Sequence, residues 1–222
     1  MPKLLQKSLW KYLINMTIGI VGMILVWILL DWIIGRDDIN IFLHVPLGLM
    51  CVPFMQFIYS SGNLPVMNDY FYIAPYSCEQ RKALVEKYFG RQFLLGCALA
   101  IAWYIFTYLY TVAAGESIHP AKVVFAMIVQ CCVYYQMLFL GYYRPRLLLM
   151  IAALITFLIG GGILTGIMED PTMSLADYIM MAILGVICAA EVLVLRLKYY
   201  EQMIDSNSCY EASRKADRVF SK

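Results

Sequence analysis

The sequence predicts an all-α, polytopic membrane protein with six transmembrane helices and both termini in the cytoplasm. Three observations predict this fold class: 62% of the residues are hydrophobic and only 14% are charged, the chain holds six long apolar runs, and its positive charges fall in alternate connections. The mean hydropathy of +0.71 reflects more apolar residues than the core of a soluble protein of this length could bury. A spanning helix needs roughly 20 apolar residues, so six spans with short loops account for most of the 222 residues.

Each apolar run is long enough to cross a bilayer with some tilt. The six runs cover residues 12–34, 39–61, 92–114, 121–142, 147–168 and 174–197. The connections after the first, third and fifth runs are short and acidic, with Asp37, Asp38, Glu116, Glu169 and Asp170. Because short connections favour antiparallel neighbours, we expect one six-helix transmembrane domain in residues 1–200.

The remaining connections and both chain ends carry the positive charge. Every lysine and arginine except Arg36 and Lys122 lies at the N-terminus, in residues 62–91, between spans four and five, or from Arg196 onward. This bias places those segments in the cytoplasm. We therefore expect a multi-pass protein of the cell membrane, which we take to be the bacterial cytoplasmic membrane, with a cytoplasmic tail at residues 201–222.

Two segments outside the spans have amphipathic patterns. In residues 1–11, leucines alternate with lysines and Trp10 can anchor the segment, which predicts an N-terminal helix at the membrane interface. In the long connection 62–91, Ser77 followed by Gln80 matches a capping box, and an apolar stripe follows it: Ala83, Leu84, Tyr88 and Phe89. An amphipathic cytoplasmic helix should therefore precede span three. It either rests on the lipid surface or docks a cytoplasmic partner.

Motifs for catalysis and for nucleotide or metal binding are missing from the sequence. There is no G-x-x-x-x-G-K-[ST] phosphate loop, no H-E-x-x-H and no G-x-S-x-G. His44 and His119 have no neighbouring metal ligands, and the formal net charge of +2 is too small to suggest nucleic acid. We therefore assign no catalytic residue, cofactor site or metal site to this chain. Cys78 and Cys209 fall in segments placed in the cytoplasm, so we expect no external disulfide.

Polar and helix-breaking residues inside the spans indicate a candidate path across the membrane. Proline in span two frees backbone groups that only protein or water can satisfy, and glycines in span five allow a break or a close helix contact. Polar side chains of span four would suit an amphiphilic molecule or hydrogen bonds between helices equally well. The candidate path residues are Pro53, Gln56, Gln130, Tyr134, Gly162 and Gly166. The alternative is that these residues serve helix packing alone.

Ionisable side chains inside a span are costly, and Glu191 is the clear case. It precedes Arg196 near the inner end of span six, so we expect a structural pair or a carboxylate that reaches the interface. Asp31 and Asp177 lie near the outer surface, where we expect water to solvate them.

The stretch DYFYIAPYSCEQRKALVEKY, residues 69–88, resembles the cytoplasmic loop of ABC-2 type transporter permeases. In that family a Pro, a small polar residue and a basic residue open a helix that ends in Lys before the third span. The six-span layout with both ends inside is similar to the family along nearly the whole chain. Two features depart from the pattern: Ala74 stands where a large apolar residue is usual, and the outer loop 169–173 is short where many members carry re-entrant helices.

The resemblance implies that residues 77–89 form a coupling helix in a groove of a separate ABC ATPase subunit, which would hold the ATP and Mg. A second permease copy, identical or paralogous, would complete the transporter, with spans two and five lining the path. The coupling residues that it implies are Pro75, Tyr76, Ser77, Glu79, Gln80, Arg81, Lys82, Leu84 and Lys87.

The expected function is therefore the membrane permease subunit of an ATP-binding cassette exporter that moves an amphiphilic peptide, lipid or drug outward by alternating access. The alternatives are an ion-coupled or passive six-span carrier and the substrate-binding membrane component of a vitamin importer. Neither alternative needs the capped loop, and an ion-coupled carrier would usually show more carboxylates in its spans. An intramembrane enzyme is disfavoured because no nucleophile, base or metal constellation is present.

Overall fold

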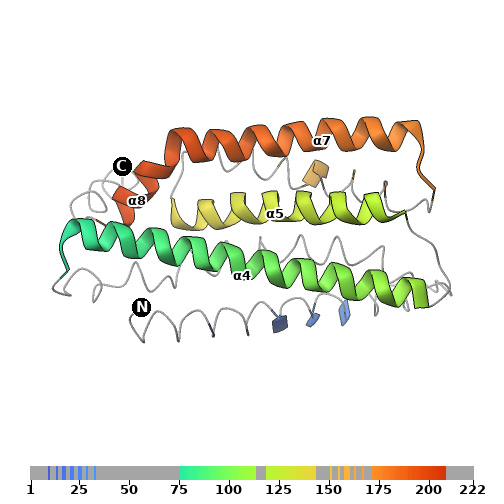
Figure 1. The fold of residues 1–222 in the computed structure, drawn as a ribbon, viewed down its shortest axis with the longest axis horizontal. Coiled ribbons are helices and arrows are strands. Elements are labelled where there is room, and N and C mark those ends of the chain that lie inside the picture. Colours follow the sequence, from blue (N-terminus) through green and yellow to red (C-terminus); the bar gives the residue numbers. More distant parts are fainter. Residues whose placement is uncertain are drawn as a thin grey trace.

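The computed structural model describes residues 76–113, 119–143 and 172–208, with single helical positions between 10 and 33 and between 151 and 167. Its elements are α4 (Cys78–Ala113), α5 (Pro120–Tyr142), α7 (Leu175–Val194), the π-helical turn η2 (Leu195–Tyr199) and α8 (Tyr200–Ser208). Every regular element among the described residues is helical (Figure 1). The all-α prediction is confirmed for this part of the chain.

Three of the described helical segments are long and apolar enough to cross a membrane: Cys78–Phe106, Pro120–Tyr142 and Leu175–Ser208. They overlap predicted spans three, four and six and are compatible with a multi-pass membrane protein. Span two lies outside the described residues, and only single positions of spans one and five are described. Within the predicted N-terminal interfacial helix, Trp10 is helical and exposed.

α4 runs without a break through both the predicted cytoplasmic helix and the predicted third span. Its buried positions recur every three or four residues and form a single stripe: Val85, Tyr88, Phe89, Gln92, Gly96, Ala100 and Tyr104. One continuous buried stripe without proline favours one long helix over two. The helix expected before span three is therefore the first part of α4 and is continuous with that span. Ala83, predicted to lie in its apolar stripe, is exposed.

α5 contacts both α4 and α7 and lies between them (Figure 1). It begins with His119 as N-cap and Pro120 in the first turn, where the missing N–H of proline costs no hydrogen bond. Every residue from 133 to 142 is buried. The second half of α5 is thus the centre of the described core.

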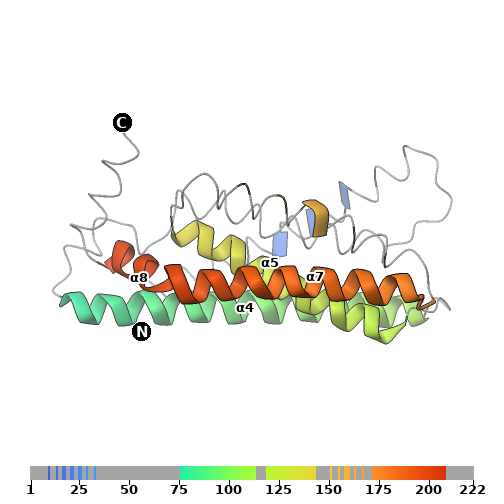
Figure 2. The same ribbon diagram turned by 90° about the horizontal axis from the view of Figure 1, so that it is seen from above.

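α7, η2 and α8 form one uninterrupted helical segment, the α7–α8 rod, which bends before α8 and ends beside the beginning of α4 (Figure 2). Only Leu184 and Cys188 are buried in α7. Large apolar side chains of this helix face outward: Leu175 is 77% exposed, and Val186 is also exposed. An apolar surface of this extent suits contact with lipid or with another membrane-spanning chain.

Candidate functional site

The start of α4 and the end of α8 meet at one end of the bundle, which holds most of the predicted coupling residues (Figure 2). Lys82 Nζ lies 2.6 Å from Asp205 Oδ1, and the Tyr200 hydroxyl donates to Glu86 Oε1 at 3.2 Å. Both contacts join α4 to the α7–α8 rod. We call residues 76–89 together with α8 the inner end, because the sequence predicts that they are cytoplasmic.

Buried hydrogen bonds connect the inner end to α5. The side-chain amide of Asn207 donates to Tyr142 O at 2.7 Å and to Met203 O at 2.8 Å. The Tyr142 hydroxyl in turn donates to Gln92 Oε1 at 2.7 Å. Because breaking such bonds would leave buried polar groups unsatisfied, α4, α5 and α8 are held in one arrangement.

Aromatic rings fill the space between these helices. Phe89 makes edge-on contacts with Tyr142 at 5.2 Å and with Tyr135 at 5.7 Å between ring centroids. It also contacts Phe139 at 6.4 Å and Tyr200 at 6.1 Å. Pairs of this geometry contribute beyond simple area burial, so the α4 start is anchored on a packed aromatic cluster.

The capping box predicted at the start of α4 is present. Ser77 N donates to Gln80 Oε1 at 3.1 Å, and Gln80 N donates to Ser77 Oγ at 3.2 Å. Arg81 donates from Nε and Nη2 to Tyr76 O at 3.1 and 2.9 Å. The Arg81 guanidinium therefore fixes the backbone of Tyr76, the residue before the capping residue Ser77.

The predicted coupling residues divide into those engaged within the chain and those facing outward. Four have hydrogen-bond or ion-pair partners within the chain: Ser77, Gln80, Arg81 and Lys82. Of the other described coupling residues, Leu84 is half-buried, and the rest are exposed: Tyr76, Glu79 and Lys87. Pro75 lies outside the described residues.

Two of the candidate path residues, Gln130 and Tyr134, are buried on α5. The Tyr134 hydroxyl donates to Gln92 O at 3.2 Å, and its ring stacks on Phe93 with centroids 6.0 Å apart. The ring also covers Gly96, where an added Cβ would overlap it. Tyr134 thus packs α5 against α4. The other candidate path residues lie outside the described part of the chain: Pro53, Gln56, Gly162 and Gly166.

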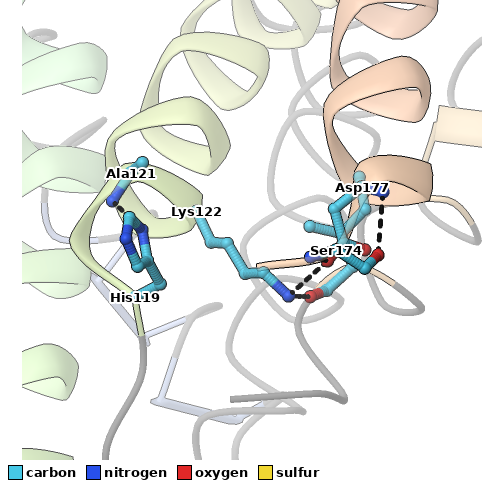
Figure 3. A network of polar contacts seen from close by, with 6 residues as sticks. His119, Ala121, Lys122, Ser174 and Asp177 are labelled. Carbon is cyan, nitrogen blue, oxygen red and sulfur yellow. Dashed lines mark hydrogen bonds and ion pairs between the residues drawn. The ribbon is translucent and has the colours of Figure 1, made fainter. Parts of the chain in front are cut away.

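Lys122, one of the two cations outside the positive-inside pattern, is fully buried near the start of α5. Its Nζ donates to Ile167 O at 2.8 Å and lies 3.0 Å from Asp177 Oδ2 (Figure 3). The Asp177 side chain is only 14% exposed. Asp177, expected to be solvated near the outer surface, is thus partly exposed and pairs with a buried ammonium group.

Asp177 also closes a capping box at the start of α7. Ser174 N donates to Asp177 Oδ2 at 2.9 Å, and Asp177 N donates to Ser174 Oγ at 3.2 Å (Figure 3). The sequence reasoning missed this site, although Ser174 and Asp177 match the [ST]-x-x-[DE] capping signal. No sequence signal places Lys122 beside them.

Glu191 contacts α5. Its Oε2 accepts a hydrogen bond from Gln136 Nε2 at 2.7 Å. Arg196, which the sequence suggested as a partner for Glu191, has its Cζ 3.7 Å from the ring centroid of Tyr200. Within the described structure, Glu191 thus helps to join α7 to α5.

No group of three or more metal-ligating side chains occurs among the described residues. Four described cysteines are free: Cys97, Cys131, Cys132 and Cys188. Cys78 is disulfide-bonded, which is unusual for a segment placed in the cytoplasm.

No family model, no curated protein and no solved structure matches the chain. The functional interpretation therefore depends on the geometry of the inner end and of the membrane-spanning helices.

Proposed function

We propose that this chain is the membrane permease subunit of an ATP-driven exporter. In this proposal the inner end docks a separate ABC ATPase that holds ATP and Mg, and the membrane part moves an amphiphilic substrate outward together with a second permease copy. The observation that supports the proposal best is the length and continuity of α4.

α4 contains 36 residues, so at 1.5 Å per residue it is about 54 Å long. The hydrocarbon core of a bilayer is only about 30 Å thick. About 24 Å of the helix would then extend beyond the hydrocarbon, and the inner end begins with this part. A long helix of this kind suits coupling, because a displacement of its first turns moves the membrane-spanning part directly.

The outward-facing coupling residues define the contact that we propose. Tyr76, Glu79 and Lys87 are exposed on the first turns of α4, and Lys87 takes part in no ion pair within the described structure. Aromatic side chains such as that of Tyr76 are enriched at protein interfaces. The opposite side of the same turns packs on α8 and α5, which gives a docked partner a rigid support.

Co-purification with an ATPase tests the proposal. The chain is expressed with the proteins encoded beside it, purified in mild detergent, and assayed for bound P-loop ATPase and for ATP hydrolysis. We expect a stoichiometric ATPase whose activity depends on this chain. Lys87→Glu should reduce ATPase retention about tenfold, which corresponds to about 1.4 kcal/mol.

Lys198→Glu is the matched control, because Lys198 is an exposed cation of η2 near the same end of the bundle. It should retain the ATPase. Arg81→Glu and Lys82→Glu are less specific tests, since these changes also break contacts to Tyr76 and Asp205. A chain that purifies without an ATPase, or equal retention by the Lys87 and Lys198 variants, would overturn the proposal and favour a carrier.

A further inference from the structure

A cavity of about 470 Å³ opens on the side of the bundle where α4, α5 and the α7–η2 segment approach one another. Its described apolar lining consists of Phe93, Ile101, Met127, Ile128 and Val192. We call this cavity the lateral groove. From Met127 to Tyr135 its wall on α5 covers nine residues, or about 12 Å along the helix. A groove of this length and composition suits a hydrocarbon chain.

One end of the lateral groove is polar. Arg196 lines it and is exposed. Its guanidinium stacks on the Tyr200 ring, and no carboxylate of the described structure lies within ion-pair distance of it. Arg196 belongs to the π-helical turn Leu195–Tyr199, and such turns inside α-helices occur frequently at functional sites.

Tyr135 lines the same end of the lateral groove. It is 9% exposed, and its hydroxyl is buried without a hydrogen-bond partner of good geometry. A buried hydroxyl in this state costs free energy unless a ligand or water satisfies it. The hydroxyl and the guanidinium of Arg196 are neighbouring groups, so one anionic oxygen group can satisfy both.

The nearby carboxylates are already engaged. Glu86 accepts from the Tyr200 hydroxyl, and Glu191 accepts from Gln136. Neither forms an ion pair with Arg196 in the described structure. The charge at this end of the lateral groove is therefore complementary to an anion whose attached chain lies along the apolar wall.

We propose that the lateral groove binds an anionic phospholipid of the surrounding bilayer. Arg196 and the Tyr135 hydroxyl hold its phosphate, and one acyl chain lies between α4 and α5. Basic residues between membrane helices on the cytoplasmic side select anionic headgroups in this way. The site is independent of the exporter function, since it uses none of the proposed ATPase contacts.

Photo-crosslinking tests the site in the full chain, reconstituted into phosphatidylcholine vesicles. The vesicles contain a trace of phosphatidylglycerol, or of phosphatidylcholine, with a diazirine on one acyl chain, and mass spectrometry locates the adducts. On residues 93–101 and 127–135 we expect about tenfold more adduct from phosphatidylglycerol, because a charge-assisted contact to Arg196 favours the anion. Arg196→Gln should lower this labelling to the phosphatidylcholine level.

Lys198→Gln is the matched control. It removes an exposed cation of the same turn that does not line the lateral groove, and it should leave the labelling unchanged. Tyr135→Phe should lower phosphatidylglycerol labelling about threefold and keeps the site testable if Arg196→Gln does not fold. Equal labelling by the two lipids, or equal effects of the Arg196 and Lys198 variants, would overturn the proposal. Equal labelling of the exposed face around Leu94 would also overturn it.

Discussion

At the residue scale, the contact between Gly96 and Tyr134 sets how closely α4 and α5 approach. The Tyr134 ring is 1% exposed and is held by its hydrogen bond to Gln92 O, so it cannot swing away without breaking that bond. We predict that Gly96→Ala lowers the free energy of unfolding by about 1–3 kcal/mol, the usual cost of overpacking a core. Thermal unfolding in detergent would measure the effect.

Gly90→Ala is the control for this prediction, because it lies on the same helix and an added Cβ at Gly90 meets nothing within 4 Å. It should be neutral or should stabilise the protein by about 0.5–1 kcal/mol through helix propensity. Equal unfolding temperatures for the two variants would show that the Tyr134 ring does not limit the approach of the helices.

At the element scale, the buried ion pair joins the start of α5 to the start of α7. Asp177→Asn removes a carboxylate that lies 3.0 Å from the fully buried Lys122 Nζ, which should cost up to about 3 kcal/mol. Lys122→Met leaves a partly exposed Asp177 that still receives hydrogen bonds at a helix N-terminus, and it should cost about 1 kcal/mol or less. Denaturant unfolding in micelles would measure both costs.

The double variant Lys122→Met with Asp177→Asn should recover part of the loss caused by Asp177→Asn alone, because the buried ammonium group is then absent. Equal costs for the two single variants, or a double variant whose loss is their sum, would mean that the ion pair is not coupled in this way.

At the scale of the whole molecule, the contacts require the start of α4 and the end of α8 to lie on one side of the membrane. A green fluorescent protein joined after Lys222 should therefore be fluorescent, as expected in the cytoplasm. The variant Glu79→Cys should react with an impermeant maleimide only after the membrane is permeabilised, with the modified peptide identified by mass spectrometry. Labelling of Glu79→Cys in intact cells beside a fluorescent C-terminus would exclude the contact between α4 and α8.

The arrangement of the whole molecule also accounts for one exception to the positive-inside pattern. Lys122 departs from the positive-inside pattern, and it is the cation that the fold buries against Asp177. Because the Asp177 carboxylate neutralises the Lys122 ammonium group, this pair contributes little to the orientation of the chain. The position of Lys122 in the sequence therefore does not conflict with the predicted topology.

Hydrophobic length and local capping signals were enough to predict the helical class and the three membrane-length helices described here. The boundaries of α5 agree with the prediction to within one residue, because a polar loop with a proline precedes it and its apolar run is uniform. The capping box of Ser77 and Gln80 was also predictable, since it involves neighbours in the sequence alone.

The sequence by itself thus determined where the apolar helices lie and how the α4 helix starts, because burial in lipid and capping depend on local composition. Only the tertiary structure decided that residues 78–89 and the third span are one helix, that Lys82 pairs with Asp205, and that Lys122 pairs with Asp177. It also decided that Arg196 and Tyr135 meet at one groove. These contacts join residues far apart in the chain, and which of them form depends on how the helices pack against one another.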